Sequence, residues 1–123
     1  MNQNKNLRVG LIGFGKMGKI RYQTLSQMEQ CVVQMVYEYN DNMATPKSLK
    51  RINSAEELIA SNDIDAVVIS APNNLIKPYV IASLEAGKHV FCEKPPGMNL
   101  PEVLSMKKAM EKSGCKLMFG FNH

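Results

Sequence analysis

The residues most able to do chemistry begin with a glycine-rich motif near the amino terminus. The motif consists of Gly13, Phe14, Gly15, Lys16, Met17 and Gly18. At this spacing Gly13 makes a tight turn, Gly15 lets the backbone approach a pyrophosphate, and Gly18 lets a helix pack closely on a strand. Free backbone amides at the helix start then face the anion. The motif predicts a dinucleotide site at these six residues, against the alternative of a glycine-rich turn that binds nothing.

An acidic residue, Glu38, ends the next apolar run, 20 residues after Gly18. A carboxylate there accepts hydrogen bonds from the hydroxyls of an adenosine ribose, whereas a 2′-phosphate in the same place meets like charge. Glu38 therefore predicts NAD as the cofactor and makes NADP the weaker candidate. Two alternatives stay open: Glu38 is a solvated strand-end residue, or Arg51 approaches a 2′-phosphate from a neighbouring strand.

Two more polar groups follow apolar runs further along the chain. Ala71, Pro72 and Asn73 come after one run, and Glu93 and Lys94 come after the next. Because ligands of open parallel sheets bind beyond the carboxyl ends of the strands, both groups are candidates to line the cofactor. A partly desolvated lysine transfers protons near neutral pH, which makes Lys94 the candidate catalytic residue. The alternatives are that Asn73 only caps a helix and that Glu93 and Lys94 are surface charges.

Short apolar runs alternate with stretches of helical spacing, and these elements must position the candidates. Runs this short and continuous are typical of buried parallel strands. We expect strands at residues 7–12, 32–37, 66–70, 89–92 and 116–119. Strand and helix in repeated alternation predict an α/β fold, a doubly wound parallel sheet of the Rossmann type with three layers, α/β/α.

The helices between these runs have recognisable ends. Ser54 and Asn99 each begin a capping box, and Gly87 and Gly114 are placed to end the helices before the last two strands. The helix expected after the glycine motif carries one apolar face, formed by Ile20, Thr24, Leu25 and Met28. Residues 40–53 are the weakest region, where a short helix and an edge strand at 49–52 are expected.

Composition bounds the function classes. With 123 residues, 45% hydrophobic residues and a net charge of +4, the chain makes roughly one soluble domain, and its dispersed basic residues argue against nucleic-acid binding. The apolar run after the polar start is too short for a signal peptide or a membrane span. An odd number of cysteines predicts reduced thiols and a cytoplasmic location, and the two histidines form no metal-ligand cluster.

Two further groups are assigned to packing. Cys92, beside the Glu93–Lys94 pair, is interpreted as a small buried hydrophobe. Four methionines are expected to face the core, namely Met28, Met106, Met110 and Met118.

The three motifs together resemble the amino-terminal domain of the Gfo/Idh/MocA oxidoreductases. The resemblance covers nearly the whole chain, and its most specific element is the Glu93-Lys94-Pro95 motif behind the Pro72-Asn73 turn. It implies NAD(P)-dependent transfer of hydride between nicotinamide and a carbinol carbon of a sugar, cyclitol or sugar derivative. It also implies that Lys94 binds the substrate hydroxyl and assists proton transfer, and that Glu93 borders the nicotinamide. Asn73 would contact the nicotinamide ribose, and a cis peptide would precede Pro95.

The chain departs from the family pattern at two points. Ile76 stands where family members often carry a histidine, and the chain ends at His123, about where the family's carboxy-terminal substrate domain begins. We therefore expect residues 1–123 to be a dinucleotide-binding domain, without that substrate domain, that binds cofactor without full turnover. A homo-oligomer is possible, since the family usually assembles through the missing domain. The alternative is a complete, non-catalytic module for dinucleotide sensing or interaction.

Overall fold

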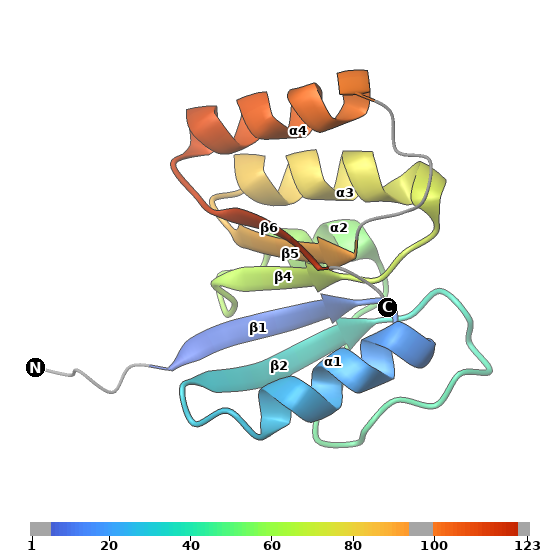
Figure 1. The fold of residues 1–123 in the computed structure, drawn as a ribbon. Helices are drawn as coiled ribbons and strands as arrows, with labels where there is room; N and C mark the ends of the chain where they lie inside the picture. The colour runs from blue at the N-terminus through green and yellow to red at the C-terminus, as the bar shows by residue number, and fades with distance from the viewer. Residues whose placement is uncertain (1–5, 94–99, 121–123) are drawn as a thin grey trace, which may run out of the picture.

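The computed structural model describes residues 6–93 and 100–120, which form one parallel sheet with helices on both faces (Figure 1). The strands lie in the order β3-β2-β1-β4-β5-β6. Their bounds are Leu7–Ile12 (β1), Cys31–Tyr37 (β2), Lys50–Arg51 (β3), Ala66–Ile69 (β4), His89–Glu93 (β5) and Leu117–Gly120 (β6). The helices are Lys16–Ser26 (α1), Ala55–Ala60 (α2), Asn73–Glu85 (α3) and Leu100–Ser113 (α4). The doubly wound Rossmann architecture predicted from the alternation of elements is confirmed.

The direction of strand addition reverses between β1 and β4. The chain builds β1, β2 and β3 toward one edge of the sheet, then returns to the other side of β1 and builds β4, β5 and β6 toward the opposite edge. All neighbouring strands in this order pair in parallel. In such sheets the crevice beyond the carboxyl ends of the strands at the reversal is where ligands bind.

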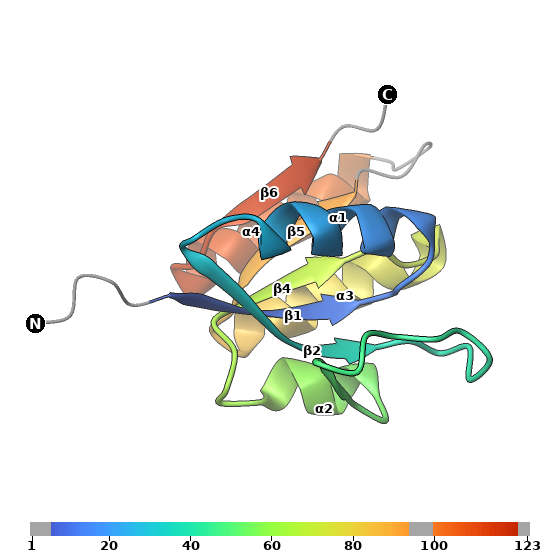
Figure 2. The same ribbon diagram turned by 90° about the horizontal axis from the view of Figure 1, so that it is seen from below.

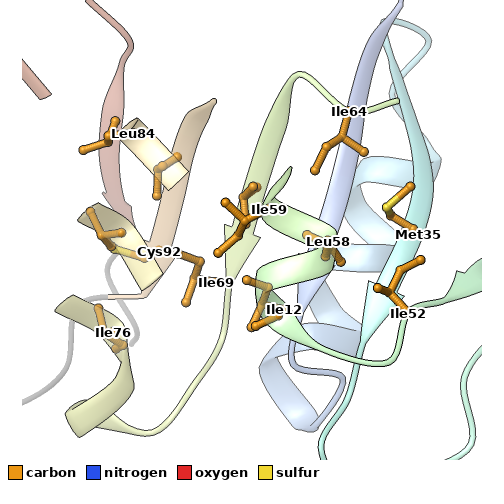
Figure 3. Close-up of a cluster of buried hydrophobic side chains, with 14 of the residues drawn as sticks. Ile12, Met35, Ile52, Leu58, Ile59, Ile64, Ile69, Ile76, Leu84 and Cys92 are labelled. Carbon is orange, nitrogen blue, oxygen red and sulfur yellow. The ribbon is translucent and has the colours of Figure 1, made fainter. Parts of the chain in front are cut away.

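A large apolar core fills the face of the sheet that α2, α3 and α4 cover (Figure 3). Ile12 and Ile69, from the two central strands, meet Leu58 of α2 and Ile76 of α3, and each of the four is at most 2% exposed. Ile76 is thus a core residue at the position where the family often has histidine. This packing fixes the central strands and their carboxyl ends relative to one another.

The opposite face carries α1 alone among the helices described (Figures 1 and 2). Tyr22 and Leu25 of α1 pack on a second, smaller cluster that includes Val9, Leu11 and Val36. On this side an apolar groove of about 460 Å³, reaching Phe91 and Met118, lies beside α1. We call it the α1-side groove.

Three apolar residues expected in the core are exposed instead. Ile20 is 40% exposed, Met28 45% and Met118 64%. The face of α1 turned to the sheet carries the buried Gly18 and the partly buried Tyr22 and Leu25, so Ile20 lies off that face. Met28 lies beyond the helix end at Ser26. Met118 faces the α1-side groove. By contrast Met106 is fully buried and Met110 packs against the large core, as predicted.

The helix ends agree with the sequence in most places. Ser54 caps α2 by accepting a hydrogen bond from the Glu57 amide at 3.1 Å, and Gly87 and Gly114 adopt positive φ after α3 and α4. The capping residue predicted for α4, Asn99, lies outside the described residues. The helix expected after Gly18 already begins at Lys16.

The region between β2 and α2 differs from the prediction. The short helix expected within residues 40–53 is absent from this fully described stretch, which forms turns and the two-residue strand β3. Leu49 and Ile52 are buried on either side of β3. Within the described residues, no helix is long and apolar enough to cross a membrane.

Candidate functional site

The glycine loop joins β1 to α1 at the reversal of strand order. Gly13 has a φ of +96°, and a Cβ added there would lie 2.0 Å from the carbonyl oxygen of Ser70. A Cβ on Gly18 would lie 2.2 Å from the carbonyl oxygen of Gly13. Both positions therefore require glycine, because the obstructing atoms are backbone.

Gly15 has a different environment from the other two glycines. A Cβ added there would meet no atom within 4 Å, so nothing inside the described protein requires its small size. Gly15 is also the residue immediately before α1, at the capping position, and it provides no side-chain hydrogen bond to the helix start. An open, uncapped helix start is what an anion such as pyrophosphate needs in order to approach the backbone amides.

Glu38 follows β2 and is bonded to two backbone amides. Its Oε1 accepts a hydrogen bond from the Phe14 amide at 2.6 Å, and its Oε2 accepts one from the Asn40 amide at 3.0 Å. The residue is only 6% exposed, which rules out the solvated strand-end interpretation. Each carboxylate oxygen retains a second lone pair that a ribose hydroxyl could use.

Arg51 shapes the loop that follows Glu38. Its guanidinium donates to the carbonyl oxygens of Met43 at 2.6 Å, Glu38 at 3.2 Å and Asn40 at 2.9 Å. This side chain was a candidate to meet a 2′-phosphate. In the structure it is instead engaged by the loop carbonyls, which explains how the loop is ordered without the expected helix.

The glycine loop and Glu38 line a cleft of about 370 Å³ at the reversal of strand order. A dinucleotide fits the chemistry of its walls, which combine the glycine loop, an acidic side chain and apolar surface. Ser70 adds an observation of its own, because its Oγ is buried and has no hydrogen-bond partner among the described residues. Burial also raises the pKa of the Tyr79 hydroxyl. The lining residues are Ile12, Gly13, Gly15, Tyr37, Glu38, Tyr39, Asn40, Met43, Ser70, Ala71, Pro72, Leu75 and Tyr79.

The second predicted group, at the end of β4, reaches the same cleft. Ala71 and Pro72 line it, and Pro72 precedes the first turn of α3. Asn73 is the first residue of α3, but its side chain lies outside what the structure describes. Lys16 and Met17 stand in the first turn of α1, where Lys16 is exposed.

The third group lies at the end of β5, where the structure describes Glu93 but not the residues after it. Glu93 Oε2 accepts a hydrogen bond from Arg21 Nε at 2.6 Å, while Oε1 is buried with no partner in the described part of the chain. This carboxylate raises the pKa of the Arg21 guanidinium through their hydrogen bond. Lys94, Pro95 and His123 lie outside the described residues, so the predictions for them are unchanged.

Cys92, next to Glu93 in β5, is fully buried. Burial, with a smaller contribution from the Glu93 charge, raises the pKa of its thiol to about 12. A thiol with such a pKa stays protonated at neutral pH and is a poor nucleophile. This agrees with the interpretation of Cys92 as a packing residue.

Several residues of the site escaped the sequence analysis. Ser70 ends an expected strand, and that position was a usable signal for its place at the cleft. Tyr79 lies on α3 next to the core residue Val80, so its spacing gave no sign that it lines the cleft. Arg21 gave no sign either, since its partner Glu93 is 72 residues away.

Comparison with known proteins identifies the family to which the chain belongs. The Gfo/Idh/MocA family model, described as an oxidoreductase family with an NAD-binding Rossmann fold, matches residues 7–121. This chain belongs to that family. The resemblance inferred from the three motifs is confirmed over nearly the whole length, and with it the fold and a nicotinamide dinucleotide as ligand.

Two curated relatives and one solved structure illustrate the likeness. The Gfo/Idh/MocA domain described here is 32% identical to myo-inositol 2-dehydrogenase of Thermotoga maritima over 94% of this chain and 36% of that protein. It is 33% identical to inositol 2-dehydrogenase of Rhodococcus erythropolis over 96% of this chain and 36% of that protein. An NAD-binding protein from Listeria innocua superposes with a TM-score of 0.87 at 31% identity, over 94% of this chain and 35% of that one. The chain thus spans about a third of the length of these relatives.

Proposed function

We propose that residues 1–123 form the cofactor-binding domain of an NAD-dependent dehydrogenase that acts on a carbinol carbon of a sugar, cyclitol or sugar derivative. The observation that carries the cofactor part is Glu38, a buried carboxylate on the cleft that is fixed by the glycine loop and by the loop after β2. The substrate class rests on the two inositol dehydrogenases to which the chain is similar. Since the chain spans about a third of their length, we propose that the substrate pocket is built mainly by other residues of the parent protein.

The preference for NAD over NADP follows from charge. The carboxylate of Glu38 offers acceptors to two ribose hydroxyls, whereas a 2′-phosphate brought to the same place would meet a negative group in a poorly hydrated setting. Arg51 is the obvious cation to offset that repulsion, but loop carbonyl oxygens engage its guanidinium. This arrangement favours the unphosphorylated ribose.

In the proposed reaction each group has a separate task. A bound nicotinamide supplies the site that gives or takes the hydride of the carbinol carbon. The glycine loop, with Gly13, Gly15 and Gly18, holds the pyrophosphate, and Glu38 holds the adenosine ribose. Lys94 binds the substrate hydroxyl and takes its proton as the carbinol is oxidised.

Calorimetry with NADH and NADPH tests the cofactor assignment. For Glu38→Gln, which removes the charge and keeps one acceptor oxygen, we expect the ratio of NADH to NADPH affinity to fall about tenfold, because ribose contacts weaken while repulsion of the 2′-phosphate disappears. Glu111→Gln, an exposed residue of α4, is the matched control and should leave the ratio unchanged. Equal losses for both dinucleotides would refute the ribose assignment.

A further inference from the structure

The helix α1 and the strands β5 and β6 come together around the side chain of Arg21, a residue of α1. Its Nε donates to Glu93 Oε2 at 2.6 Å, and its guanidinium carbon lies 5.0 Å from the centroid of the Phe91 ring. Glu93 pairs with Gly120 of β6, and a Cβ on Gly120 would lie 3.1 Å from Arg21 Nη2 and 2.7 Å from Phe91. The guanidinium and the ring therefore occupy the space above Gly120 of β6, and the ion pair ties α1 to the end of β5.

Glu93 is incompletely satisfied within this cluster. Its side chain is 13% exposed, its Oε2 holds the ion pair, and its Oε1 is buried without a partner among the described residues. Leaving a carboxylate oxygen unpaired away from water is unfavourable. A carboxylate with an unpaired oxygen stays in place only where other contacts hold it, and here the contact is the ion pair with Arg21.

The place of this cluster in the sheet indicates which half of a dinucleotide it serves. A doubly wound sheet binds one mononucleotide half on each side of the reversal of strand order. Glu38 and the glycine loop belong to the β1–β2 side, which takes the adenosine half. Glu93 stands at the carboxyl end of β5, on the other side, which takes the nicotinamide half.

We propose that Arg21 is a positioning residue for the nicotinamide half of the cofactor, acting through Glu93. By holding Glu93 Oε2 it fixes the end of β5, from which the chain continues directly into Lys94. Arg21 itself touches neither the cofactor nor the substrate. The inference rests on the proposed function, because it assumes that the cleft binds a nicotinamide dinucleotide.

The test compares NADH with ADP-ribose, which keeps the adenosine half and the pyrophosphate but lacks nicotinamide. Calorimetry on the 123-residue chain should show NADH affinity about tenfold lower in Arg21→Met, with ADP-ribose affinity changed less than about twofold. Arg21→Lys, which keeps the charge but not the planar fork, should fall in between. Lys19→Met, an exposed lysine of the same helix, is the matched control for loss of one positive charge and should affect neither ligand.

A second comparison shows whether the effect passes through Glu93. In a Glu93→Gln background, Arg21→Met should change NADH affinity less than about twofold, because the group it positions has already been altered. Equal losses for NADH and ADP-ribose, or no loss for either, would overturn the proposal and leave Arg21 a structural residue. If Arg21→Met does not fold, Arg21→Lys serves instead, and the test is again whether NADH affinity falls more than ADP-ribose affinity. Failure of the unaltered chain to bind either ligand would instead refute the proposed function, and the inference with it.

Discussion

Glu38 and Glu93 both lie at the carboxyl-terminal ends of apolar strands, β2 and β5, yet the fold holds them by different means. Glu38 is bonded to two backbone amides, one of them only two residues away. Glu93 is held by a single side chain, that of Arg21, and keeps one oxygen unpaired among the described residues. The first carboxylate is fixed by the backbone, the second by a side-chain contact.

The difference separates two kinds of preorganisation. Around Glu38 the glycine loop and the loop to Asn40 are tied together by main-chain groups, so this side of the cleft is set once the chain has folded. At the end of β5 the geometry depends on Arg21, a side chain 72 residues away in sequence. Damage to the Glu38 side should therefore cost stability, and damage to the Glu93 side should cost mainly ligand affinity.

The largest expected effect comes from Gly13→Ala. The added methyl carbon would lie 2.0 Å from the carbonyl oxygen of Ser70, at a φ of +96° that side chains rarely adopt. Together the clash and the backbone strain should lower the free energy of unfolding by about 4 kcal/mol or more. Urea denaturation followed by circular dichroism measures the loss. A loss below about 1 kcal/mol would show that the loop is not fixed by backbone contacts.

Gly15→Ala is the matched control within the same loop. Nothing lies within 4 Å of its added carbon, so stability should change by less than about 1 kcal/mol. The same carbon enters the space where pyrophosphate approaches the backbone, and NADH affinity should fall. The pair separates the glycine that the fold requires from the glycine that the ligand requires.

A direct comparison of the two carboxylates ranks next. Glu38→Ala leaves the buried amide of Phe14 and the partly buried amide of Asn40 without their acceptor, which should cost about 2–3 kcal/mol of stability. Glu93→Ala should cost about 1 kcal/mol or less, because Arg21 is partly exposed and still packs over Phe91. Urea denaturation of the two variants side by side gives the order. The reverse order would contradict the distinction between backbone and side-chain support.

The sequence was informative where function depends on the local backbone. Gly13 and Gly18 were predicted because a turn and a close helix–strand contact each demand glycine, and the structure gives both their steric reason. Glu38 was located by its spacing from the motif. One of its two amide partners lies in the glycine loop after β1 and the other in the loop after β2, and no sequence pattern showed that Glu38 would be buried.

Contacts between distant segments were out of reach of the sequence. The region around residues 40–53 was expected to contain a helix, but it forms a loop in which Arg51 donates hydrogen bonds to carbonyl oxygens of residues 8 to 13 positions before it. Met118 was expected to face the core, but it is 64% exposed and lines the α1-side groove. The catalytic role of Lys94 stays a prediction.

The smallest effect tests how dry the end of β5 is. The Cys92 thiol has a pKa of about 12 in the folded protein, against an ordinary value of 9.0, so between these values the folded state binds more protons than the unfolded state. The contribution of this thiol to the free energy of unfolding is therefore fully present below pH 9, and it falls as the pH rises above 9. The loss should be about 1 kcal/mol between pH 9 and pH 10.

Urea denaturation at pH 8, 9 and 10 measures this slope against Cys92→Ala, whose lost packing is an offset independent of pH. Tyr79, whose pKa is raised above 10.0, adds a fall of the same sign only at higher pH, which is why the window ends at pH 10. Equal slopes in both proteins would mean that water reaches Cys92 and the end of β5. In that case water would also hydrate the unpaired oxygen of Glu93, and the ion pair with Arg21 would contribute little to the position of Glu93. A steeper slope in the unaltered protein supports a dry strand end where the side-chain contact decides the geometry.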